Sequence, residues 1–146
     1  MNLLVTGGDA HERRLVALTF HRESPQHLGP FVTVPCGLEE EHLTAGLEAW
    51  AATGDATAAD ALLAAQGGTL FLDEIGRLSR HAQRLLLLFV RQLGGDTCDD
   101  GPPLRLAAGN EGNLDQAAAD GAFSPPLLDC LDKIHVELAA PVRGAA

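Results

Sequence analysis

Basic residues are scarce in this sequence, and acidic residues outnumber them two to one. The 146 residues include 10 Lys and Arg against 20 Asp and Glu, which gives a net charge of −10. A protein that neutralises nucleic-acid phosphates needs clustered Lys and Arg, and an anionic membrane surface attracts the same residues. This chain has a single lysine, Lys133. The composition therefore argues against direct binding to nucleic acid and against a membrane partner.

Cysteines and long apolar runs are also few. The three cysteines are odd in number and far apart, which fits neither a disulfide framework nor a zinc motif. No apolar stretch approaches the roughly 20 residues that a membrane helix requires. The first residues lack the basic region and cleavage site of a signal peptide. We therefore expect a protein of the reducing cytoplasm.

Apolar residues make up 46% of the chain, which is enough for one core in a chain of single-domain size. Short apolar runs typical of strands alternate with Ala- and Leu-rich stretches typical of helices. The predicted strands are residues 3–6, 31–34, 69–72, 104–108 and 134–138, and the predicted helices are 11–21, 38–52, 56–65, 80–93, 114–119 and 127–131. This alternation predicts an α/β fold with a mostly parallel five-stranded sheet and helices on both faces. We expect one domain over residues 2–138 and a loose tail over 139–146.

Three short polar segments each follow a predicted strand. They are Gly7–Gly8, Asp73–Glu74 and Gly109–Asn110. In open parallel sheets, ligands bind outside the carboxyl ends of the strands. We therefore expect these segments to share one edge of the sheet.

Residues 67–76, Gly-Gly-Thr-Leu-Phe-Leu-Asp-Glu-Ile-Gly, resemble the Walker B segment of the sigma-54 activators, a branch of the AAA+ ATPases. Weaker matches stand in the family's order along the chain. They are residues 3–17 for the first strand, P-loop and helix, 30–36 for the second strand (with Pro35 where the family has Asn), 104–110 for the sensor I strand and 121–131 for the arginine-finger segment. The resemblance covers residue 3 to about residue 138. It implies a three-layer P-loop NTPase-like core.

The P-loop of this family binds phosphates through inward-facing backbone N–H groups, which glycines permit, and through a lysine. The corresponding phosphate-binding residues here are Gly7, Gly8, Arg13 and Arg14. Ala10 and Glu12 stand at two of the glycine positions, and Arg13 stands at the lysine. A carboxylate at Glu12 would face the phosphates, and two like charges about 4 Å apart at a dielectric near 20 repel by about 4 kcal/mol. We expect no resident cofactor, and only weak binding of ATP and magnesium.

The Walker B acids are retained. By the resemblance, Asp73 would help hold magnesium if a nucleotide binds, Glu74 would polarise the attacking water, and Asn110 stands at sensor I. These three are the candidate catalytic residues, in a vestigial site. Two acids after a buried strand are also common as solvated loop residues, and Asn is an ordinary turn residue.

The arginine fingers are absent from the sequence. Ala122, Ser124 and Cys130 stand where the family has arginines, and such an arginine contributes roughly 10³–10⁵ in rate. The family's sigma-54-contacting loop carries a Phe before Thr-Gly. The nearest stretch here, residues 51–56, lacks that Phe, and we expect the core domain to lack the helical lid.

These observations favour a degenerate, non-catalytic relative that regulates transcription through protein contacts. The partner would be a true AAA+ activator or a second copy of the chain. Two alternatives stay open: a residual ATP-binding protein with very slow or no hydrolysis, and a folded remnant without a role. A specific hypothesis follows for the site. Either Arg13 turns toward Asp73 and Glu74 and takes the space of a magnesium–phosphate unit, or all these side chains point into water.

Overall fold

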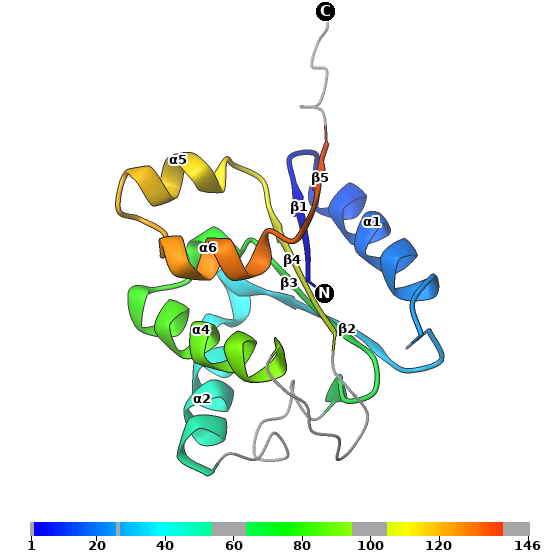
Figure 1. The fold of residues 1–146 in the computed structure, drawn as a ribbon, viewed down its shortest axis with the longest axis horizontal. Coiled ribbons are helices and arrows are strands. Elements are labelled where there is room, and N and C mark those ends of the chain that lie inside the picture. Colours follow the sequence, from blue (N-terminus) through cyan, green and yellow to red (C-terminus); the bar gives the residue numbers. More distant parts are fainter. Residues whose placement is uncertain (1, 26, 54–63, 95–104, 139–146) are drawn as a thin grey trace, which may run out of the picture.

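The protein forms a parallel five-stranded sheet. The computed structural model describes residues 2–25, 27–53, 64–94 and 105–138 (Figure 1). The strands are β1 (Leu3–Thr6), β2 (Phe31–Pro35), β3 (Thr69–Asp73), β4 (Arg105–Asn110) and β5 (Ile134–Glu137). Their order across the sheet is β2-β3-β4-β1-β5, and every neighbouring pair is parallel. This confirms the predicted fold class.

Helices cover both faces of the sheet. The helices are α1 (Ala10–Arg22), α2 (Cys36–Thr53), α4 (Arg80–Gly94), α5 (Leu114–Ala119) and α6 (Pro125–Leu131), and a short 3₁₀ turn, η2 (Ile75–Arg77), follows β3. Alternate residues of a strand point to opposite faces. Leu3 and Val5 pack with Ala17 of α1, whereas Leu4 packs with residues of α2, α4, α5 and α6. Figure 1 accordingly shows α1 on one side of the sheet and the other helices opposite.

Two helices, α1 and α6, begin earlier than predicted because a capping side chain went unrecognised, and α2 begins at Cys36 and not at residue 38. The predicted cap Ser79 accepts a hydrogen bond from the Ala82 N–H at 3.1 Å, and Asn113 caps α5 as expected. However, α6 begins at Pro125, because the Ser124 side chain caps it, and not at residue 127. The predicted helix 56–65 and loop 94–103 lie mostly outside the described residues, as does the tail 139–146.

In the described part of the chain, no helix has both the length and the apolar character needed to span a bilayer.

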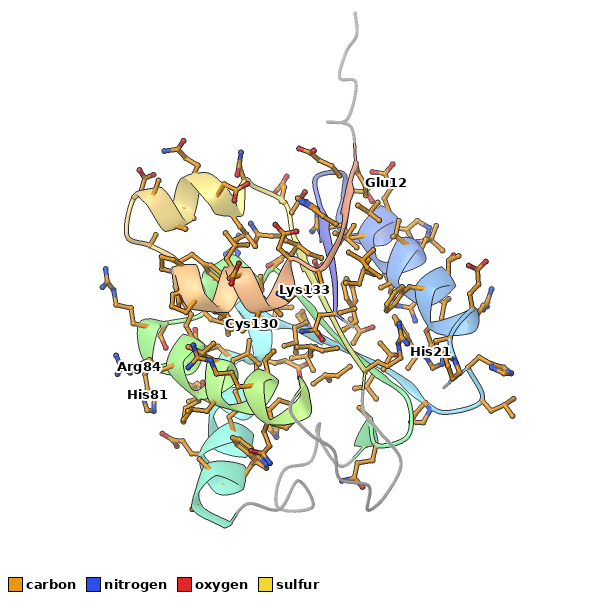
Figure 2. All side chains as sticks on the ribbon, in the orientation of Figure 1. Glu12, His21, His81, Arg84, Cys130 and Lys133 are labelled. Atoms are coloured by element: carbon orange, nitrogen blue, oxygen red, sulfur yellow. The ribbon has the colours of Figure 1, made fainter. Side chains whose placement is uncertain are left out.

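A buried histidine fixes the position of α1 on the sheet. His21 lies in the last turn of α1, and its Nδ1 is 2.8 Å from the Thr69 hydroxyl at the start of β3. Its Nε2 is 3.0 Å from the Gly29 carbonyl oxygen. Figure 2 shows His21 and Glu12 at opposite ends of α1. The contact therefore places the amino end of α1, which includes Glu12, at the carboxyl edge of the sheet.

Candidate functional site

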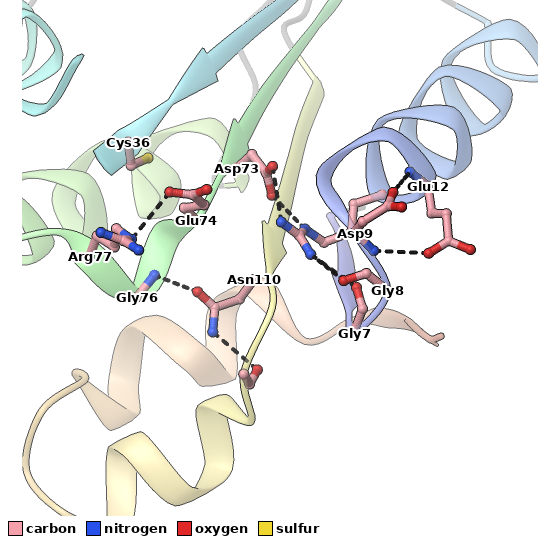
Figure 3. Close-up of polar contacts among 12 residues, drawn as sticks. Gly7, Gly8, Asp9, Glu12, Cys36, Asp73, Glu74, Gly76, Arg77 and Asn110 are labelled. Atoms are coloured by element: carbon pink, nitrogen blue, oxygen red, sulfur yellow. Dashed lines mark hydrogen bonds and ion pairs between the residues drawn. The ribbon is translucent and has the colours of Figure 1, made fainter. Parts of the chain in front are cut away.

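The three polar segments predicted to share one edge come together there (Figure 3). The Gly7 N–H donates to the Asn110 carbonyl at 3.0 Å. Gly109 lies so close to Asp73 that a Cβ at Gly109 would be 2.6 Å from the carboxylate Oδ1. The residues at the carboxyl ends of β1, β3 and β4 thus form one cluster of polar groups.

The Arg13 side chain lies among these polar groups and is buried, with 2% of the residue exposed. Its Nε donates to Asp73 Oδ1 at 2.8 Å, and one terminal nitrogen lies 3.4 Å from Oδ2. The other terminal nitrogen donates to the carbonyls of Gly7 at 3.1 Å and Gly8 at 2.9 Å. The Asp73 side chain is 8% exposed. A buried charge needs this kind of full pairing, so Arg13 and Asp73 hold each other in place.

The glycine loop presents oxygen atoms to Arg13. Gly7 and Gly8 both have positive φ, at 87° and 62°, a conformation that glycine adopts without steric cost. The loop also packs against Leu138, because a Cβ at Gly7 would be 2.3 Å from the Leu138 carbonyl oxygen. A phosphate-binding loop needs inward N–H donors. Here the Gly7 and Gly8 carbonyls face inward and accept hydrogen bonds from the Arg13 guanidinium.

The amino end of α1, the usual anion-binding element of such folds, is occupied by the chain's own carboxylates. The Asp9 side chain accepts from the Glu12 N–H at 2.8 Å, and the Glu12 side chain accepts from the Asp9 N–H at 2.9 Å. This reciprocal pattern is a capping box. Glu12 therefore lies inside the helix, where a negative φ is normal, and its carboxylate binds backbone that could otherwise face an anion.

Glu74 has a different partner from Asp73. It is the one residue other than glycine with positive φ (57°) in the described part of the chain. This backbone conformation turns its side chain toward Arg77, whose Nε lies 3.2 Å from Glu74 Oε1. The pair is solvent-accessible, with side-chain exposures of 69% for Arg77 and 35% for Glu74. Of the two Walker B acids, the structure thus joins Asp73 alone to Arg13.

Asn110 and Arg14 also have partners within the chain. Asn110 Oδ1 accepts from the Gly76 N–H at 2.9 Å, and its Nδ2 donates to the Gly112 carbonyl at 3.0 Å. The Arg14 guanidinium lies 5.5 Å from the ring centre of Phe31 on β2. Arg14 is therefore directed away from the predicted phosphate site, although it follows Arg13 directly in sequence.

A buried thiol lies beside the two acids. Burial, and after it the negative charges of Asp73, Glu40 and Glu74, raise the pKa of Cys36 to about 12. Cys36 is therefore a neutral thiol at physiological pH. It packs as a small apolar residue at the start of α2.

The residues at this edge do not fit a magnesium–triphosphate unit. Arg13 bonds to both Asp73 oxygens, the Gly7 and Gly8 carbonyls face a cation, and capping carboxylates occupy the helix terminus. Across the described ranges, no three His, Cys, Asp or Glu side chains are grouped so that they could hold a metal ion. The contacts observed at this edge are an internal ion pair and hydrogen bonds to backbone groups.

Two of the contacts at this edge were not anticipated from the sequence. Arg77 binds Glu74, and its spacing of three residues was the available signal, since such neighbours meet across one turn. Leu138 packs on the glycine loop, and no local pattern indicates this because residues 7 and 138 are brought together only by the pairing of β1 with β5.

Comparisons with known proteins agree with this architecture. Residues 1–137 match the family described as the sigma-54 interaction domain. The chain is 33% identical to the DNA-binding transcriptional regulator NtrC of Rhizobium meliloti, over 100% of this chain and 32% of that protein. It is 31% identical to the transcriptional regulatory protein GlrR of Escherichia coli, over 96% of this chain and 34% of that protein. The chain thus spans about a third of the length of these curated relatives.

Solved structures show the same fold. NtrX from Brucella abortus, crystallised in complex with ATP, is similar with a TM-score of 0.74 and 25% identity, over 95% of this chain and 31% of that one. The P-loop NTPase domain of an Escherichia coli sigma-54 activator is similar with a TM-score of 0.60 and 22% identity, over 97% of this chain and 84% of that one.

Proposed function

The chain belongs to the sigma-54 interaction domain family, and from that premise we propose that it is a non-catalytic member that regulates transcription through protein contacts and not through ATP hydrolysis. The observation that carries this proposal is the buried Arg13 guanidinium, bonded to Asp73 at 2.8 Å. A triphosphate and its magnesium would have to displace a paired charge that has little access to water.

The capped end of α1 supports the same proposal. Asp9 and Glu12 together place two negative charges at the helix terminus, where a relative with an active P-loop would need to accept anionic phosphates. Opening this site would require the loss of both capping hydrogen bonds and the approach of like charges. These costs add to the cost of separating Arg13 from Asp73.

The segment that resembles the arginine-finger region has a structural role here. Ser124 caps α6 by accepting a hydrogen bond from the Leu127 N–H at 3.3 Å, and Pro125 is the first helical residue. Pro is favoured at that position because it has no N–H to leave unpaired. Ala122 and Cys130 carry no positive charge. The chain therefore lacks, at these positions, the cation that stabilises phosphoryl transfer.

Titration calorimetry with MgATP tests the proposal directly. We expect no saturable heat with the parent protein and no phosphate release above background. Turnover of about 1 s⁻¹, the low end for phosphoryl-transfer enzymes, that disappears in Glu74→Gln would contradict the proposal. Saturable binding without turnover would favour the alternative of a residual ATP-binding protein.

The protein-contact half of the proposal needs its own experiment. An open-complex assay with purified sigma-54 polymerase and a full-length activator can be run with increasing amounts of this chain. We expect no promoter opening by this chain alone and a dose-dependent change in opening by the activator. Opening by this chain alone, or no change at any ratio, would contradict the proposal.

A further inference from the structure

The strand β5 lies at one edge of the sheet and presents backbone groups along its outer side. Among the described strands it has β1 as its one neighbour. The Ile134 N–H donates to Asn2 at 3.1 Å and the Leu138 N–H donates to Thr6 at 2.7 Å, both toward β1. Backbone groups alternate in direction along a parallel strand. The N–H and C=O groups of His135 and Glu137 therefore point outward.

One face of this edge is apolar and open. Helix α1 packs against β1, β2, β3 and β4, and a hollow of about 370 Å³ remains beside β5, lined in part by Leu15, Phe20, Ile134 and Val136. Leu15 is 47% exposed and Ile134 is 37% exposed. An edge strand with an exposed apolar side is a template for pairing with another strand.

The charges at the two ends of β5 make this edge complementary to itself. Lys133 precedes the strand (Figure 2), and Glu137 is its last residue. If two copies pair antiparallel with His135 opposite His135, Lys133 of each copy lies opposite Glu137 of the other. Ile134 then lies opposite Val136. Opposite charges and β-branched residues are favourable cross-strand pairs.

We propose that this edge binds a second copy of the chain, with β5 pairing antiparallel to β5 about a two-fold axis at His135. The outward N–H and C=O groups of His135 bond to those of its counterpart. The Glu137 N–H donates to the Lys133 carbonyl of the other copy, whereas the Lys133 N–H already donates to Leu131 at 2.9 Å within its own chain. A two-fold interface presents the same patch from both sides, so every favourable pair occurs twice.

A second copy fits this edge better than an unrelated acidic or basic strand. An all-acidic strand would repel Glu137, and an all-basic strand would repel Lys133. The antiparallel copy supplies the opposite charge at both ends. The inference names one partner for a domain proposed to act by protein contact, and it rests on that part of the proposed function.

Charge reversal tests the interface. Sedimentation of the full chain up to about 1 mM, where a dimer with a Kd of about 1 mM is substantially populated, should show a monomer–dimer equilibrium. Lys133→Glu places Glu opposite Glu, and Glu137→Lys places Lys opposite Lys. We expect each to weaken dimerisation by about tenfold or more, which is the factor that 1.4 kcal/mol produces, and the double variant to restore it.

The matched controls are Arg91→Glu on α4 and Glu41→Lys on α2, which change the net charge equally at exposed residues. These should dimerise like the parent. A monomer at all concentrations, a dimer indifferent to the β5 charges, or a double variant that is not restored would overturn the proposal. A phosphate-release assay on the same samples separates the two proposals. ATP turnover that disappears in Glu74→Gln contradicts the non-catalytic proposal whatever the oligomeric state, whereas a monomer that hydrolyses no ATP contradicts the pairing alone.

Discussion

A guanidinium enclosed by oxygen atoms depends on its counter-ion, and the counter-ion depends on the guanidinium. Removing one member of a buried pair leaves the other charge uncompensated, which typically costs about 3–5 kcal/mol. Arg13 and Asp73 are 2% and 6% exposed, so this cost applies nearly in full. Breaking this pair is therefore expected to lower the free energy of unfolding more than breaking a solvent-accessible pair such as Arg77 with Glu74.

We predict that Arg13→Ala lowers the free energy of unfolding by about 3–5 kcal/mol and that Arg13→Lys lowers it less. Lysine keeps the charge but cannot bond to Asp73 and the two carbonyls in the same planar geometry. Urea denaturation followed by circular dichroism measures both. The control is Arg14→Ala, which removes an exposed arginine worth about 1 kcal/mol or less through its contact with Phe31. Equal effects of Arg13→Ala and Arg14→Ala would contradict the prediction.

The buried thiol predicts a specific pH dependence. Cys36 has an ordinary value of 9.0 and a folded-state pKa of about 12. Because the folded value is higher, the unfolded chain releases the proton first. The stability contributed by the neutral thiol is therefore complete below pH 9 and is lost as the pH rises toward 12. The difference between the two values corresponds to roughly 4 kcal/mol at full titration.

The advantage of the parent over Cys36→Ala should accordingly shrink between pH 9 and pH 11 in urea denaturation. Cys130→Ala removes a half-buried thiol and is the matched control for the loss of a cysteine side chain. A constant gap between parent and Cys36→Ala would show that deprotonation of this thiol does not oppose folding.

Among the elements, α1 has a start that local side chains explain. Its capping box satisfies two backbone N–H groups that a helix start leaves unpaired. Replacing a capping Asp with Ala costs about 0.5–2 kcal/mol, whereas Ser retains most of the cap. The cap therefore adds to the stability that the Arg13–Asp73 pair provides one turn away.

We expect Asp9→Ala to lower the thermal midpoint measurably and Asp9→Ser to lie close to the parent in differential scanning calorimetry. Asp129→Ala removes an exposed acid from α6 and serves as the charge-matched control, with an expected effect within about 0.5 kcal/mol. The prediction is wrong if Asp9→Ala melts together with Asp129→Ala.

The positions of the strands and helices, and the edge of the sheet that the three polar segments share, could be predicted from the sequence because each depends on local patterns. Apolar runs located the strands, and parallel topology brought Gly7, Asp73 and Asn110 to one edge. The start of α1 was missed by one residue because Asp9 resembles part of a phosphate loop. The choice of Asp73 over Glu74 as the partner of Arg13 was not predictable, since it depends on the left-handed backbone at Glu74.

At the scale of the whole molecule, the parallel sheet and its helices are those of the family, and side chains from α1 pair with groups at the carboxyl edge of the sheet. We therefore predict that the triple variant Ala10→Gly, Glu12→Gly, Arg13→Lys gains MgATP binding. It restores the loop glycines, removes one capping carboxylate and replaces the guanidinium with the smaller ammonium. Titration calorimetry measures the gain, and the melting temperature should fall because one hydrogen bond of the capping box is lost and the buried pair is weakened.

The single variant Arg13→Lys is the control for this restoration, because Glu12 still carries its charge at the loop. It should bind no nucleotide. If the triple variant also binds no nucleotide, the three side chains of α1 are not what prevents binding. Residues outside α1 would then have to prevent it.

The reciprocal bonds of Asp9 with Glu12 and of Arg13 with Asp73 have an evolutionary consequence. A lineage returning to nucleotide binding by single substitutions would first lose the cap or loosen the buried pair, and it would still repel phosphate at that stage. On the proposed function, each first step is expected to lower stability before any nucleotide binding is gained. If the chain is the non-catalytic member proposed above, these reciprocal bonds would hinder a return to nucleotide binding.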